Sequence, residues 1–153
     1  MIQRLLTRLA LAGAFVALPA LLPATAKAGT SLPPVLNAQF TPNHVLPAGV
    51  TQIRFDIGNP NASTLTGVGF TFTLPAGLSV NNIGATPIAC GTVSATSPST
   101  ITYSNGSIAA NTPSTNSPCN VEVNVTATTQ GVYTGTSTAI TSTQGGSGNT
   151  ASA

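Results

Sequence analysis

The sequence has few charged side chains and no tryptophan. Nucleic-acid binding needs Lys and Arg gathered on one face, and the four basic residues of this sequence form no such cluster, so we expect no nucleic-acid partner. One His and two carboxylates fall short of the ligand set of a usual metal site. We therefore expect neither a bound metal nor a cofactor.

The sequence also lacks the residue sets on which catalysis usually depends. A Ser-His-Asp hydrolase could be assembled from His44, Asp56 and a serine, but the orienting carboxylate of such a triad is buried. Asp56 alternates with Phe55 and Ile57 and should face solvent. His44 follows Pro42 and Asn43, at an expected strand edge. We therefore expect no enzymatic activity.

The N-terminus has the organisation of a secretory signal peptide. Two arginines precede an apolar run over residues 9–22, and a small-x-small site follows, ending at Ala28. The run is shorter than the ~20 apolar residues of a membrane span. We predict a signal peptide over residues 1–28, cut between Ala28 and Gly29, with a cut after Ala26 as the alternative. The protein would then be secreted, periplasmic or displayed on the cell surface, without membrane insertion after cleavage.

Cleavage after Ala28 would change the electrostatic character of the chain. The remaining residues include one basic side chain, Arg54, and two acidic ones, Asp56 and Glu122, so the formal net charge becomes −1. Solubility then depends on Thr, Ser and Asn, and Thr suits the solvent face of a strand. Disordered chains usually combine low hydrophobicity with high net charge. Neither applies here, which favours a single folded all-β domain.

Apolar and polar residues alternate along several short segments, which is typical of half-buried β-strands. The clearest segment covers residues 67–74, where Val68, Phe70, Phe72 and Leu74 share one face. Strands are expected at residues 36–40, 51–58, 67–74, 78–83, 91–95, 100–103, 119–128 and 132–141, and Ser104 to Ser107 give the strongest local turn signal.

About seven short strands without a helical period predict an immunoglobulin-like β-sandwich. We place this single domain at residues 37–143, after a flexible lead over residues 29–36. Residues 144–153 are interpreted as a Gly/Ser-rich tail or the start of an incomplete last strand. The predicted core consists of the inward apolar residues: Phe40, Ile53, Phe55, Ile57, Val68, Phe70, Phe72, Leu74, Leu78, Val80, Val121, Val123, Val125 and Tyr133.

Two further pairings follow from the predicted strands. Two cysteines beside strands of an exported chain favour a bridge over free thiols, so we predict a Cys90–Cys119 disulfide. Arg54 and Glu122 occupy polar positions of strands that neighbour each other in an immunoglobulin-like order. We expect this pair to meet on the outer face of one sheet.

An ordered series of short motifs covers nearly the whole chain after residue 28. It includes Phe40-Thr-Pro, Leu46-Pro-Ala-Gly, Phe70-Thr-Phe-Thr-Leu-Pro-Ala-Gly-Leu, Cys90-Gly, Cys119-Asn-Val-Glu-Val-Asn-Val and Gly131-Val-Tyr-Thr. The series resembles the bacterial immunoglobulin-like conserved-repeat domains of unknown function found in secreted and cell-surface proteins. The resemblance implies an extracellular β-sandwich building block, and the family has no agreed catalytic role. Members often carry Asp where this chain has Phe72, and they usually continue into a further apolar strand after the Asn-Thr-Ala-Ser-Ala motif.

Two functions are compatible with these features. The first is a structural or interaction module of the cell exterior. The second is an adhesin-type module that binds a ligand, for example a surface glycan, through the polar loops at residues 59–65 and 109–118. Sugar binding favours exposed aromatics, and Tyr103 is the only aromatic near a loop. Because residues 132–141 contain no charge and no proline, we also predict that this strand edge pairs with itself or with another surface protein.

Overall fold

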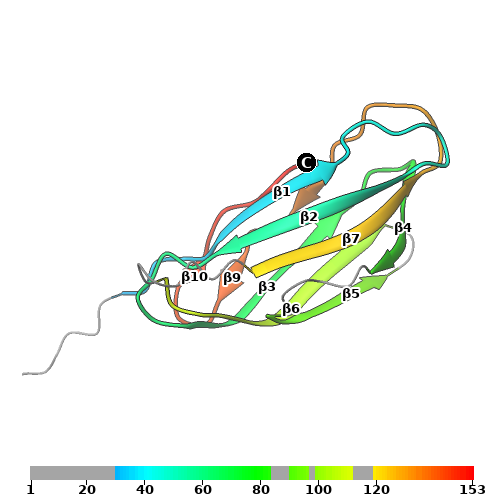
Figure 1. The fold of residues 1–153 in the computed structure, drawn as a ribbon. Coiled ribbons are helices and arrows are strands. Elements are labelled where there is room, and N and C mark those ends of the chain that lie inside the picture. Colours follow the sequence, from blue (N-terminus) through cyan, green and yellow to red (C-terminus); the bar gives the residue numbers. More distant parts are fainter. Residues whose placement is uncertain (1–29, 84–89, 97–98, 112–118) are drawn as a thin grey trace, which may run out of the picture.

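The computed structural model describes residues 30–83, 90–96, 99–111 and 119–153. Within these ranges the chain forms ten strands and no helix, and the strands build two sheets that pack face to face (Figure 1). The predicted all-β, immunoglobulin-like sandwich is confirmed. The predicted signal peptide and its cleavage site at Ala28 and Gly29 lie outside the described residues.

The first sheet has four strands in the order β1-β2-β7-β4. These are β1 (Val35–Thr41), β2 (Val50–Gly58), β7 (Cys119–Ala127) and β4 (Leu78–Ile83). The second sheet has six strands, of which β10-β9-β3-β6-β5 form one path while β8 also pairs with β3. These are β10 (Gly146–Ser147), β9 (Thr141–Ser142), β3 (Leu65–Thr73), β6 (Thr100–Ile108), β5 (Thr92–Thr96) and β8 (Thr136–Ser137).

The core lies between the sheets because the longest strands keep a two-residue period. In β2, Ile53, Phe55 and Ile57 are buried, while the residues between them are only half-buried. Phe55 of the four-stranded sheet reaches Phe70 and Phe72 of β3, with ring centroids 5.0 and 5.1 Å apart. Each such side chain, when fully buried, contributes about 1.5–3 kcal/mol to folding.

Most of the predicted core residues are buried, and three are only partly so: Phe40, Val80 and Tyr133. The predicted core left out nine other residues that are also buried. These are Leu36, Leu65, Ile101, Tyr103, Ile108, Cys119, Ala127, Ile140 and Ala151.

Residues 104–107 do not form the predicted turn. Strand β6 continues through them, and its pairing with β3 shifts register there. Asn105 has a φ of 54°, a conformation that Asn tolerates better than most residues. The same Asn-Gly chemistry that favours a tight turn therefore supports a bulge inside a strand.

The predicted strand at residues 132–141 is also wrong. This part of the chain forms only the two-residue strands β8 and β9 against β3. Gly135 lies against the ring of Phe72, where a Cβ atom would come within 2.5 Å of the ring, and the buried positions that follow include Ser137 and Ser142. Because small residues occupy these inner positions, the segment has no clear apolar alternation. The sequence therefore offered little support for one continuous strand over residues 132–141.

The outer edge of residues 135–140 is covered by the end of the chain. Gly135 and Ala153 exchange two backbone hydrogen bonds of 2.9 and 3.1 Å, and the backbone N–H of Ser137 donates to the Ala151 carbonyl at 2.9 Å. The premise of the strand-edge pairing predicted here is therefore wrong. Residues 146–153, hereafter the C-terminal segment, are part of the second sheet's edge.

The C-terminal segment also contacts the first sheet. The side-chain amide of Asn149 accepts a hydrogen bond from the Leu36 backbone N–H (2.9 Å) and donates to the Leu36 carbonyl (2.7 Å). Figure 1 shows the segment running beside β1 and in the same direction. One side chain thus replaces the backbone partner that β1 lacks on this side and joins the two sheets.

Candidate functional site

A network of charged side chains lies on the outer face of the four-stranded sheet. Arg54 donates from Nε to Asp56 Oδ1 at 2.8 Å, and its Nη1 lies 3.9 Å from Glu122 Oε1. The register places Arg54 of β2 directly opposite Glu122 of β7, so the predicted neighbourhood is confirmed. These three residues carry all the Arg, Lys, Asp and Glu charge of residues 29–153.

Asn120 completes this network. With its amide nitrogen facing Asp56, it donates to Asp56 Oδ1 at 2.7 Å and accepts from Arg54 Nη2 at 2.8 Å. The guanidinium is thus held by a carboxylate and an amide, with a second carboxylate nearby, and this arrangement fixes its plane on the sheet surface. We call Arg54, Asp56, Asn120 and Glu122 the polar face.

A hollow of about 440 Å³ adjoins the polar face. Its lining includes β1 residues, residues of β2 and β7 that belong to the polar face, and the chain that follows β2 and β6. The residues outside the polar face include Val35, Asn37, Asn59, Pro60, Ala109 and Asn111. Amide groups that both donate and accept therefore surround the hollow together with an ion pair.

The two loops predicted as a binding region lie side by side at this hollow. Asn59 donates from Nδ2 to the Ser63 carbonyl (2.8 Å) and to the Ala109 carbonyl (2.9 Å). The Asn111 backbone N–H donates to the Asn61 carbonyl at 2.8 Å. Residues 59–65 and 109–111 are thus tied together, whereas residues 112–118 of the second predicted loop lie outside the described residues.

His44 and Asp56 are not brought together. His44 lines a separate hollow of about 300 Å³, together with Phe40, Val132 and Tyr133. Asp56 is paired with Arg54 instead. Across the described ranges, no group of three or more His, Cys, Asp or Glu side chains could hold a metal ion. None of the described residues belongs to a helix long and apolar enough to cross a membrane.

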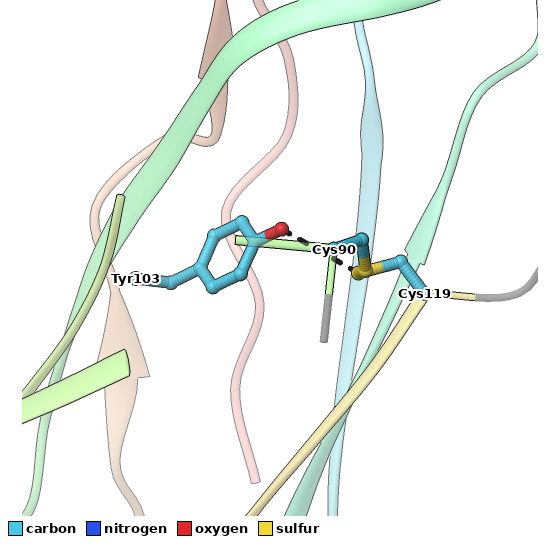
Figure 2. The surroundings of a disulfide bond; sticks show 3 residues. All are labelled: Cys90, Tyr103 and Cys119. Carbon is cyan, nitrogen blue, oxygen red and sulfur yellow. Dashed lines mark hydrogen bonds between the residues drawn. A yellow bond between two sulfur atoms is a disulfide. The ribbon is translucent and has the colours of Figure 1, made fainter. Parts of the chain in front are cut away.

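Cys90 and Cys119 form the predicted disulfide, with Cα atoms 6.0 Å apart. Cys119 begins β7 and Cys90 lies two residues before β5, so the bond links the two sheets. Figure 2 shows the ring of Tyr103 pointing at this bond, with its hydroxyl 3.5 Å from Cys119 Sγ. Burial raises the pKa of Tyr103 to about 12.

Tyr103 is therefore not available to stack on a sugar. Its exposure is 1%, and its ring stacks on Phe70 with centroids 5.6 Å apart. Gly91 and Gly106 leave room for its hydroxyl, because a Cβ atom at either position would come within 2.6 Å of that oxygen. The two glycines are the signal in the sequence that could have indicated a buried tyrosine.

Comparison with known proteins assigns this chain to a family. The model of a domain of unknown function, DUF7933, matches residues 34–153. The chain belongs to this family. The match runs from the residue before β1 through the C-terminal segment, so the DUF7933 domain includes both sheets and the residues that join them.

Solved structures similar to this DUF7933 domain share little sequence with it. A non-cellulosomal cohesin from the hyperthermophilic archaeon Archaeoglobus fulgidus is 12% identical, with a TM-score of 0.46 over 78% of this chain and 88% of that chain. A chain of the CaDoc0917–CaCohA2 complex is 10% identical, with a TM-score of 0.38 over 77% of this chain and 97% of that chain. Among curated proteins, no sequence matches.

Proposed function

We propose that this DUF7933 domain is a non-catalytic interaction module of the cell exterior, carried by a secreted or surface-displayed bacterial protein. The disulfide between the sheets supports an oxidising compartment, because such bonds form and persist outside the cytoplasm. The signal-peptide pattern over residues 1–28 supports export. The resemblance to surface repeat domains supports the same context.

The polar face is the proposed binding surface for a partner. All three charged side chains of residues 29–153 gather on one rigid sheet, beside a hollow and two loops. Binding residues in β-sandwiches commonly lie on loops that a rigid scaffold positions. A surface that is otherwise uncharged offers a partner one directional feature, the Arg54 guanidinium between its two carboxylates.

Export is tested by expressing the full chain in a bacterium and measuring the intact mass of the protein outside the cytoplasm. We expect a chain that begins at Gly29 and contains one disulfide. A mass that retains the first residues, or protein found only in the cytoplasm, would contradict the proposal.

Binding is tested with purified domain and cell-envelope material of the producing strain. We expect saturable binding that Arg54→Glu weakens at least several-fold, because the substitution reverses the only positive charge of the polar face. Ser107→Glu on the exposed side of β6 is the matched control, since it places the same side chain on the other sheet. Equal binding by the two variants would exclude the polar face.

A second candidate function is binding of a neutral polar ligand such as a surface glycan. The amide-lined hollow between residues 59–65 and 109–111 favours it, since amides pair with hydroxyl groups as donors and acceptors. The burial of Tyr103 counts against it. Titration calorimetry with envelope oligosaccharides would separate the two candidates, because binding to isolated sugars, abolished by Asn111→Ala, supports only the second.

A further inference from the structure

The two sheets have four edges, and three of these edges are blunted. At β1, the Asn149 side chain occupies the outward backbone groups of Leu36. At β4, the ladder with β7 has a bulge between Val80 and Asn82, and bulges hinder further pairing. At the remaining edge of the second sheet, β10 has only two residues.

Strand β5 differs from these three edges. Its five residues pair with β6 in unbroken register, from Thr92 opposite Ser104 to Thr96 opposite Thr100. Within the described part of the chain, β6 is its only ladder partner. The strand has no charge, no proline and no bulge, which are the usual means by which natural proteins prevent an edge from pairing.

The alternation of exposed and half-buried residues in β5 is symmetric about Ser94, so the strand can pair antiparallel with a second copy of itself. Thr92 and Thr96 are exposed, Val93 and Ala95 are half-buried, and Ser94 at the centre is exposed. Antiparallel pairing of two such strands about Ser94 places Thr92 opposite Thr96 and Val93 opposite Ala95. The two residues of each pair then point to the same face of the joined sheet, and successive pairs alternate between the two faces.

We propose that two copies of this chain pair antiparallel through β5, with Ser94 on the two-fold axis. This register uses all five residues of each strand, whereas a shift by two residues keeps the alternation but loses pairs. A second copy is the occupant because the pattern complements itself and brings no like charges together. The six-stranded sheets of the two copies become continuous, and the polar face on the other sheet is not used.

The two-fold register makes a sharp prediction for a cysteine at position 94. Directly opposed residues of antiparallel strands have Cβ atoms about 4.5–5.5 Å apart, close to what a disulfide spans. We expect Ser94→Cys to form a covalent dimer under mild oxidation, with Cys90 and Cys119 still bonded to each other. Ser107→Cys, exposed on β6, is the matched control and should stay monomeric on the same non-reducing gel.

Sedimentation of the wild-type protein over a concentration series supplies the second measurement. We expect the mass to rise toward twice that of the monomer, and Ser94→Lys to remain monomeric because it opposes two positive charges across the axis. Ser107→Lys should associate like wild type, and thermal melts should show both variants folded. A wild type that stays monomeric throughout, a Ser94→Lys variant that still dimerises, or equal cross-linking of the two cysteine variants would overturn the proposal. Because envelope binding is measured separately with Arg54→Glu, failure of the dimer leaves the proposed interaction function untouched.

Discussion

At the scale of single residues, Tyr103 joins the aromatic core to the disulfide. Its ring stacks on Phe70, which in turn contacts Phe55 of the opposite sheet, and its hydroxyl lies against Cys119 Sγ. Burial disfavours the phenolate, which is why the pKa of Tyr103 rises to about 12. A buried hydroxyl at this place makes the stability of the fold sensitive to strongly alkaline pH.

The pKa of Tyr103 sets the pH range of this effect. An exposed tyrosine titrates near about 10, so the folded state holds the Tyr103 proton more tightly than the unfolded state does. The associated stability is fully present below about pH 10 and is lost as pH rises through the folded-state pKa of about 12. Ultraviolet titration of Tyr133→Phe, in which Tyr103 is the only phenol, should show phenolate near pH 12. Ionisation near a pH of about 10 in a folded protein would contradict this expectation.

The ion pairs of Arg54 are expected to matter little for stability. The Arg54 and Asp56 side chains are more than a third exposed, and exposed ion pairs contribute only about 0–1 kcal/mol because solvent screens them. We expect Arg54→Gln to leave the melting temperature almost unchanged. A loss of several degrees in a calorimetric melt would contradict this expectation and show that the network stabilises the fold.

At the scale of elements, two side-chain hydrogen bonds of Asn149 tie the C-terminal segment to β1. Asn149→Ala removes both bonds to Leu36, and at about 0.5–1.5 kcal/mol net for each bond we expect a loss of about 1–3 kcal/mol in the free energy of unfolding. Thr150→Ala, at the next exposed position, is the control and should be close to neutral. Urea unfolding of the three proteins measures the difference, and equal midpoints would show that Asn149 does not hold the segment.

The strands of five or more residues could be predicted from the sequence, and the two-residue strands β8, β9 and β10 could not. Strands β2, β3 and β7 each bury one face, so their two-residue period records the core directly. The C-terminal segment pairs through Asn149 with a residue 113 positions away, and no local pattern encodes such a bond. The bulge at Asn105 shows the same limit, because Asn-Gly permits a positive φ without specifying whether the strands turn.

The candidate site was predictable to a similar extent. The two-residue alternation along β2 and β7 was enough to predict that Arg54 and Glu122 lie close together on one face of the sheet. The insertion of Asn120 between Arg54 and Asp56, and the bonds that Asn59 makes to the chain after β6, required the register of the folded sheets.

At the scale of the whole molecule, the Cys90–Cys119 bond is the covalent link between two sheets that also meet through apolar contacts and a few side-chain hydrogen bonds. It closes a loop with a sequence separation of 29, for which chain-entropy estimates give about 3–4 kcal/mol. We expect reduction to lower the free energy of unfolding by about that amount. Guanidinium unfolding with and without a phosphine reductant measures it, and a Cys90→Ala, Cys119→Ala double variant should be insensitive to the reductant. An unchanged midpoint for reduced wild type would contradict the estimate.

The parallel course of β1 and the C-terminal segment determines how the molecule responds to tension. Gly148 packs against the Pro34 backbone and Asn149 is bonded to Leu36, while Ala153 lies near the far end of β1 (Figure 1). A pull on Thr30 and Ala153 in opposite directions acts along both segments, so they slide past one another in shear. The contacts between them must then break together rather than one after another. We expect a domain built in this way to resist stretching, which suits the role outside the cell that we propose.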